Sequence, residues 1–426
     1  MIKIENSEKF TSDFNTMLNI VIFNSMGFFF LDFLIPFIAS QVLNATGIEI
    51  GLIFSVQLFG FLISSSFTGF ITDKVKSRKK LILLGSLGRG CGYFILYSAI
   101  ILSSLIGMNI GTFSIGFFAG FFWIPLDTLI AEKSNKIHRS YAYGKRESAI
   151  GKGMLIGSIF GFTIFGFAIS STTNPFIIYM AIPLFGIANF YAGIRFYRNV
   201  DESIKFNQDL IRETEKKDIL TKLPRRMILG IVILMIVLIL ASINGSIGRP
   251  FFNVYILEEI INNPTIAMIA FIPSGFVPLF LSPKIGGIVD KLHPALGISL
   301  SSALGSLVTW FLINSPNVIM FSILYVLDVT IISVGNLVFQ NFLSRISIKS
   351  RGKVLGLRSF SSNFGGIIGP IIGGFLWDIL GHQAPFVISI LVELTLIPMY
   401  ILAVYSLKNY LTETYGIEEK IQLEKI

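Results

Sequence analysis

The sequence predicts an all-α membrane protein with twelve transmembrane helices, divided into two related six-helix halves, with both termini in the cytoplasm. Three observations support this prediction. The chain of 426 residues is 53% hydrophobic but only 14% charged, whereas soluble globular proteins carry about 25% charged residues. Its apolar residues form runs long enough to cross a bilayer. Its Lys and Arg residues are concentrated in alternate connections between those runs.

The apolar runs predict the spanning helices. A bilayer core about 30 Å thick requires roughly 20 apolar residues in helical conformation. Runs of this length favour helices over the short alternating strands of a membrane barrel. We therefore expect spanning helices at residues 16–40, 47–70, 81–105, 107–131, 149–171, 175–196, 227–256, 264–289, 294–314, 317–342, 354–380 and 384–407.

The basic residues predict the orientation of these spans. Connections after odd-numbered spans contain no Lys or Arg, and those after even-numbered spans are basic. Short loops rich in Lys and Arg stay in the cytoplasm, so the even-numbered connections and both termini are expected there. This distribution explains the net charge of +9 without nucleic acid, because the positive charge faces an anionic lipid surface. The predicted organisation is an N-terminal bundle (1–194), a cytoplasmic linker (195–226), a C-terminal bundle (227–407) and a cytoplasmic tail (408–426).

The two halves share sequence at corresponding places. A G-x-x-x-D-K motif occurs at 69–74, after the second span, and again at 286–291, after the eighth, 217 residues later. The segment that begins at Arg139 also aligns with the one that begins at Arg351 at a constant offset of 212, with identities that include Arg139/Arg351, Gly144/Gly356, Arg146/Arg358, Gly157/Gly369 and Gly161/Gly373. Internal repeats of this kind are found in many transporters. We therefore interpret the chain as two related six-helix bundles.

Twelve spans, a central linker and the repeated charged loop make the chain resemble the major facilitator superfamily. The stretch GGIIGPIIGG at 365–374 also resembles the small-residue motif that drug–proton antiporters of this family carry in span 5. The resemblance implies two pseudo-symmetric bundles around a central cavity that spans 1, 4, 7 and 10 line. It also implies close helix packing at Gly365, Gly369, Pro370, Gly373 and Gly374.

The charged loop after span 2 has a second expected role besides its effect on topology. An acid contributes nothing to cytoplasmic retention, and in the resembling family the equivalent of Asp73 meets the N-terminal end of span 11 when the cytoplasmic side is closed. A helix N-terminus favours an anion. A merely solvated acid is the alternative interpretation. The expected conformational latch comprises Gly69, Asp73, Arg78, Gly286, Asp290, Arg351 and Arg358.

Ionisable side chains at membrane depth are costly unless they are paired or hydrated, so each is a functional candidate. Asp32 in span 1 and Arg249 in span 7 are separated by the same 217 residues as the repeated loop. We expect them to form an ion pair, or a site for substrate and protons, in the cavity. The alternative is that Asp32 only holds span 1 against a neighbour. Asp328, in the middle of span 10, is a further candidate for binding substrate or a proton.

Three other residues within the spans have a structural role as one interpretation. Glu393 in span 12 and Arg89 in span 3 are peripheral in the resembling family, where structural pairing is expected. Glu393 remains a secondary candidate for binding protons. Trp123 lies in the aromatic span 4, where its ring would suit a flat lipophilic or cationic substrate. Core packing is the alternative.

The sequence contains no phosphate-binding loop, nucleophile constellation or metal cluster, so we expect neither an enzyme nor a cofactor. We expect a monomeric secondary active transporter of the cell membrane that works by alternating access. The expected activity is proton-coupled export of small hydrophobic or amphipathic molecules, with the lipid bilayer, the substrate and protons as partners. The alternatives are proton-coupled uptake of a sugar or organic anion, with Arg249 binding a carboxylate, or a non-transporting sensor on the same fold.

Overall fold

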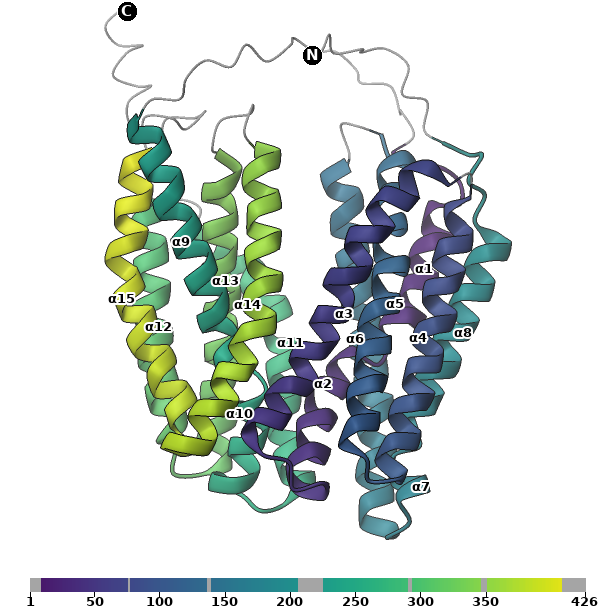
Figure 1. The fold of residues 1–426 in the computed structure, drawn as a ribbon, viewed down its shortest axis with the longest axis horizontal. Coiled ribbons are helices and arrows are strands. Elements are labelled where there is room, and N and C mark those ends of the chain that lie inside the picture. Colours follow the sequence, from purple (N-terminus) through teal and green to yellow (C-terminus); the bar gives the residue numbers. More distant parts are fainter. Residues whose placement is uncertain are drawn as a thin grey trace, which may run out of the picture. The chain divides into compact units, whose positions relative to one another are not determined.

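The computed structural model describes residues 9–75, 77–135, 139–205, 225–289, 293–345 and 351–407. These ranges are helical apart from short turns and one isolated bridge between Phe10 and Ser134. The chain divides into two compact units, shown in Figure 1 with colours that follow the sequence. The first contains residues 1–45 and 52–218. The second contains 46–51 and 219–426.

Helices of the first unit pack around α1, α4 and α6. The contacting pairs are α4 with α5, α4 with α8, and α1 with α6 and α8. Helix α3 contributes its residues from Leu52 onward to this unit. The elements are α1 (Phe14–Ser25), α2 (Phe28–Phe37), a π-helical turn (Ile38–Val42), α3 (Gly47–Lys74), α4 (Arg78–Ile101), α5 (Leu105–Glu132), α6 (Arg139–Ser171), α7 (Pro175–Ile178) and α8 (Ala181–Asn199).

Helices of the second unit pack in a corresponding arrangement. Helix α9 contacts α14 and α15, α12 contacts α13 and α15, and α11 contacts α13. The elements are α9 (Arg225–Ile247), α10 (Phe251–Tyr255), a π-helical turn (Ile256–Ile260), α11 (Pro264–Val289), α12 (Pro294–Ile313), α13 (Val318–Arg345), α14 (Arg351–Leu380) and α15 (Ala384–Leu407).

Helix lengths and surfaces agree with a membrane protein. Among the described residues, ten helical stretches are long and apolar enough to cross a bilayer, and the described part of α11 contributes a shorter apolar stretch, Pro264–Val277. The predicted sixth span is divided into the short α7 and the longer α8. Side chains such as Phe70, Phe167 and Ile319 are at least 70% exposed. Large apolar surfaces of this kind are covered by lipid.

Two predicted spans are interrupted rather than continuous. The first breaks between α1 and α2, around Gly27, and the seventh breaks between α9 and α10, where Pro250 lacks the N–H that a continuous helix needs. Both spans end in a π-helical turn. In transporters, broken helices commonly contribute to binding sites. Side chains at the two breaks are therefore candidates for the functional site.

Glycines permit close helix packing in each unit. A Cβ added at Gly369 of α14 would lie 2.6 Å from the Ile243 carbonyl oxygen of α9, and Gly365 and Gly373 meet α9 in the same way. In the first unit, Gly157 of α6 packs against the backbone of Met26 at the end of α1. Three glycines of the predicted small-residue motif therefore lie in the interface between α14 and α9, whereas Gly374 packs against the backbone of Gly47 at the start of α3.

Candidate functional site

Asp328 lies in the middle of α13 and is only 2% exposed. The Thr309 hydroxyl of α12 lies 2.7 Å from its Oδ1 and 2.9 Å from the Gly305 carbonyl oxygen. One hydroxyl proton can satisfy only one of these two acceptors. If Asp328 carries a proton, it donates to Thr309, and Thr309 donates to Gly305. The geometry therefore suits a carboxyl group that binds a proton.

Asp32 and Arg249 both lie close to the helix breaks. Asp32 is half-buried in the second turn of α2, and Arg249 is exposed between α9 and α10. Asp32 also acts electrostatically on the Tyr93 hydroxyl of α4. The two residues belong to different units. Their direct pairing therefore stays a prediction.

Arg89 is fully buried in α4 and is held by neutral groups. It donates to the Asn24 side-chain oxygen of α1, and its guanidinium lies 4.9 Å from the centre of the Phe28 ring. Asn24 in turn donates to Ser86 and to Asn189 of α8. Structural pairing was expected for Arg89, and these partners are amide and aromatic groups. The sequence does not reveal these partners, because Asn24, Ser86 and Asn189 lie on three helices that are distant in sequence.

Glu393 of α15 occupies a polar cluster in the second unit. Its Oε2 accepts from Asn244 Nδ2 of α9 at 3.0 Å, and its Oε1 accepts from the Ser302 hydroxyl of α12. Asn244 and Ser302 are buried, and Glu393 is partly buried. These contacts connect three helices. They are consistent with structural pairing, and a role of Glu393 in binding protons stays a prediction.

Trp123 packs against aromatic neighbours in the first unit. Its ring lies 4.9 Å from that of Phe122 and 6.1 Å from that of Phe28, and it rests on a buried cluster that includes Phe14 and Leu126. Core packing accounts for these contacts. A role in binding substrate stays a prediction.

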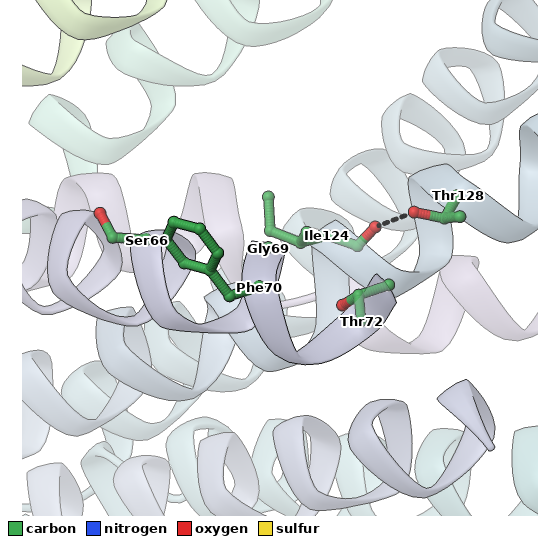
Figure 2. A pocket seen from close by; sticks show the side chains of 6 residues that line it. All are labelled: Ser66, Gly69, Phe70, Thr72, Ile124 and Thr128. Carbon is green, nitrogen blue, oxygen red and sulfur yellow. Dashed lines mark hydrogen bonds between the residues drawn. The ribbon is translucent and has the colours of Figure 1, made fainter. Parts of the chain in front are cut away.

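A pocket of about 320 Å³ lies beside Gly69 at the end of α3, as Figure 2 shows. It is lined by Ser66, Gly69, Phe70, Thr72, Ile124 and Thr128. The three hydroxyl groups already donate to carbonyl oxygens of their own helices, and Figure 2 marks the bond from Thr128 to Ile124. The pocket therefore offers a ligand no unused hydroxyl donor.

The predicted latch is described only in part. Arg78 forms an ion pair with Glu132 at 2.6 Å and donates to the Thr72 carbonyl oxygen, so it joins the ends of three helices of the first unit. The helical backbone is described at four other positions, but their side chains are not: Asp73, Gly286, Arg351 and Arg358. Asp290 lies outside the described residues. The latch therefore stays a prediction.

Lys133, at the end of α5, forms a buried ion pair that the sequence did not reveal. Its side chain is 1% exposed, and its Nζ lies 2.7 Å from the Asp13 carboxylate. The same Nζ donates to the carbonyl oxygens of Asp201 and Ile204, which follow α8. It resembles any other loop lysine in the sequence, because its partners are more than 60 residues away.

Comparison with known families agrees with this architecture. The family described as Major Facilitator Superfamily matches residues 17–347 and 234–414. The chain belongs to this superfamily. It is therefore a multi-pass transporter protein of the cell membrane and not an enzyme, and its partners are the lipid bilayer and a small-molecule substrate.

Relatives of this superfamily member include two proteins named for drug resistance. It is 25% identical over 382 residues to Multidrug resistance protein 2 of Bacillus subtilis (strain 168), covering 85% of this chain and 89% of the relative. It is 26% identical over 361 residues to Quinolone resistance protein NorA of Staphylococcus aureus (strain MSSA476), covering 83% and 86%.

Solved structures of two transporters share its fold at low sequence identity. A bacterial homolog of the human lysosomal transporter Spinster, in an inward-facing and unoccupied conformation, gives a TM-score of 0.75 at 12% identity and covers 96% of this chain and 100% of that one. The nucleoside transporter NupG gives a TM-score of 0.64 at 13% identity and covers 93% and 98%.

Proposed function

We propose that this protein is a monomeric secondary active transporter that exports small hydrophobic or amphipathic molecules in exchange for protons by alternating access. In the proposed topology, twelve spans place both termini in the cytoplasm. The fold family and the names of the two relatives support the class of substrate. The alternation of basic and non-basic connections supports the topology.

The buried carboxyl group of Asp328 carries the coupling part of the proposal. An ionised carboxylate at membrane depth is strongly disfavoured unless a cation compensates it. Among the described residues, the hydrogen-bond partner of Asp328 is the neutral Thr309, and this geometry is satisfied when Asp328 holds the proton. Release of that proton would leave an uncompensated charge and would favour a conformation that hydrates it. Proton binding and conformational change are thereby linked.

The other candidate residues have distinct proposed roles. Asp32 and Arg249 form the outer part of the substrate and proton site, and Trp123 supplies an aromatic contact for a lipophilic substrate. Asp73 is the anion that meets the N-terminus of the eleventh span when the cytoplasmic side closes. Each role is separable by mutation, because the residues lie on different helices.

The test uses purified protein in proteoliposomes with an internal pH-sensitive dye. We expect a lipophilic cation to drive proton movement in the wild type, and both Asp328→Asn and Asp32→Asn to abolish it, with substrate binding retained in Asp328→Asn. Thr309→Val should retain flux, because it removes a partner and keeps the carboxyl group. Proton movement that persists in both carboxyl variants would contradict the proposed coupling.

Uptake of an organic anion is the second candidate, because Arg249 is exposed at the break of the seventh span and a guanidinium binds carboxylates in bidentate fashion. The same proteoliposomes distinguish the two. Proton-driven accumulation of organic acids, lost in Arg249→Gln and absent for lipophilic cations, would favour uptake over export. Saturable binding without flux of any tested compound would favour a sensor.

A further inference from the structure

Each unit contains a buried polar cluster at corresponding helices. In the first unit, Asn24 Nδ2 of α1 donates to Asn189 Oδ1 of α8 at 3.0 Å and to Ser86 Oγ of α4 at 3.1 Å. All three side chains are fully buried. Every member of this cluster is uncharged. Arg89, which lies three residues after Ser86, donates to the side-chain oxygen of Asn24, Oδ1.

The second unit repeats this cluster with one change of charge. Asn244 of α9 and Ser302 of α12 take the places of the first Asn and Ser, and Glu393 of α15 takes the place of the second Asn. Three residues after Ser302 the chain has Gly305, so the counterpart of Arg89 is absent. The Asn244 Oδ1 atom is buried and has no hydrogen-bond partner in the described part of the chain.

In the described part of the chain, the hydrogen-bond partners of Glu393 are the neutral side chains of Asn244 and Ser302. The described part of α12 contains no Asp, Glu, Lys or Arg, although His293 caps its start, whereas α9 begins with Arg225 and Arg226 and is followed by Arg249. Asp328 of α13 is bound to Thr309, and Asp378 of α14 accepts from the backbone at the start of α3. The tyrosines Tyr400 and Tyr405 are the other titratable groups on α15. An anion at membrane depth without a cation is strongly disfavoured.

We propose that Glu393, Asn244 and Ser302 form a second proton-binding site, in which the bound proton completes a ring of three hydrogen bonds. In the ionised form both carboxylate oxygens accept, and the Asn244 oxygen is left without a donor. With a proton on Oε1, Glu393 donates to Ser302, Ser302 donates to Asn244 Oδ1, and Asn244 Nδ2 donates to Oε2. Every polar atom of the cluster then has a partner.

The repeated cluster supports the bond that protonation adds. In the first unit, the equivalent side chains lie within hydrogen-bond distance, because Asn24 Nδ2 donates to Ser86 Oγ at 3.1 Å; the proposed bond joins the same two positions with Ser302 as the donor. Forming that bond in the second unit ties α9 to α12. Asn244 lies one helical turn before Gly248, where the seventh span breaks. Protonation of Glu393 would therefore change the contacts of α9 close to Arg249. In this way the site would contribute to the proposed transport cycle.

Infrared difference spectroscopy of the full-length protein in lipid nanodiscs tests proton binding directly. Acid-minus-neutral spectra of the wild type should show the C=O stretch of a protonated carboxyl group, and Glu393→Gln should remove one such band. Asp328→Asn should remove a different one. Asn244→Ala should shift the Glu393 band, whereas Asn24→Ala, the matched change in the first unit, should leave it in place.

Identical spectra for wild type and Glu393→Gln, across the pH range in which both stay folded, would overturn the proposal. If Glu393→Gln does not fold, Glu393→Asp must shift the band, and an unshifted band has the same consequence. The coupling role rests on the proposed function, but proton binding does not. Substrate-driven proton flux without a Glu393 band would contradict only this inference. A Glu393 band without any flux would contradict only the proposed export.

Discussion

Ionisable side chains in the interior of this protein are stabilised in three different ways. Lys133, at the end of α5, meets a carboxylate, Arg89 meets an amide and an aromatic ring, and Asp328 and Glu393 meet hydroxyl and amide donors. A fixed cation must be compensated permanently, whereas a carboxyl group can lose its charge by taking up a proton. These two carboxyl groups, like the proposed proton site at Asp32, are therefore able to change state during a cycle.

The Asp328 site yields a prediction that separates its proton from its hydrogen bond. Thr309→Val removes the hydroxyl but leaves the carboxyl group, so we expect transport to continue with a changed dependence on pH. Asp328→Asn removes the titratable group, so substrate-driven proton flux should be lost. Flux measured over a series of pH values checks both variants. Equal pH profiles for wild type and Thr309→Val would contradict the assigned partner.

The Lys133 ion pair should matter more for stability than a surface pair. Lys133→Met leaves the Asp13 carboxylate without its cation, and breaking a buried pair typically costs about 3–5 kcal/mol. Lys205, 55% exposed beside Glu132, is the control, because exposed pairs contribute about 0–1 kcal/mol. Thermal unfolding in detergent should show a large drop for Lys133→Met and almost none for Lys205→Ala. Equal decreases in the unfolding temperature of the two variants would contradict a larger contribution of the buried pair.

Helix pairs are the next scale, and glycine sets how closely they approach. The α9–α14 and α1–α6 pairs correspond in the two units, and in both the glycines of the second helix pack on the backbone of the first. Lipid provides no hydrophobic force between helices, so such close packing is a main source of their association. Each pair includes one of the broken spans, which makes its packing part of the candidate site.

Substitution of a single glycine tests the α9–α14 interface. A Cβ at Gly373 would meet the Ile247 carbonyl oxygen inside contact distance, and overpacking of this kind costs about 1–3 kcal/mol. Gly245→Ala on α9 is the matched control, because a Cβ there meets nothing within 4 Å and alanine favours helix by about 0.5–1 kcal/mol. Midpoints of thermal unfolding in nanodiscs should fall for Gly373→Ala only. A fall in both variants would mean that the interface is not responsible.

For the whole molecule, hydropathy and charge predict the fold class, whereas the polar clusters depend on side-chain packing that the sequence does not show. The family and its helical character follow from long apolar runs and alternate basic loops, because the bilayer constrains every residue of a span. The clusters around Asn24 and Asn244 depend on which faces of three distant helices meet. A single polar residue in an apolar run does not show this. The break at Gly27 is invisible for the same reason, since the contact with Tyr93 involves another helix.

The cytoplasmic latch is a prediction for the whole molecule, because it concerns the exchange between conformations. Asp73→Asn removes an anion expected to favour the closed cytoplasmic side by about 0.3–2 kcal/mol, which is at most about a 30-fold change in the ratio of the two conformations. Transport should fall, while expression and substrate binding are retained. Asp201→Asn is the control, because this carboxyl group binds Ser203 at the surface after α8. Since a solvated acid contributes nothing to closure, unchanged transport in Asp73→Asn would remove the latch and leave the basic residues of the loop with a topological role alone.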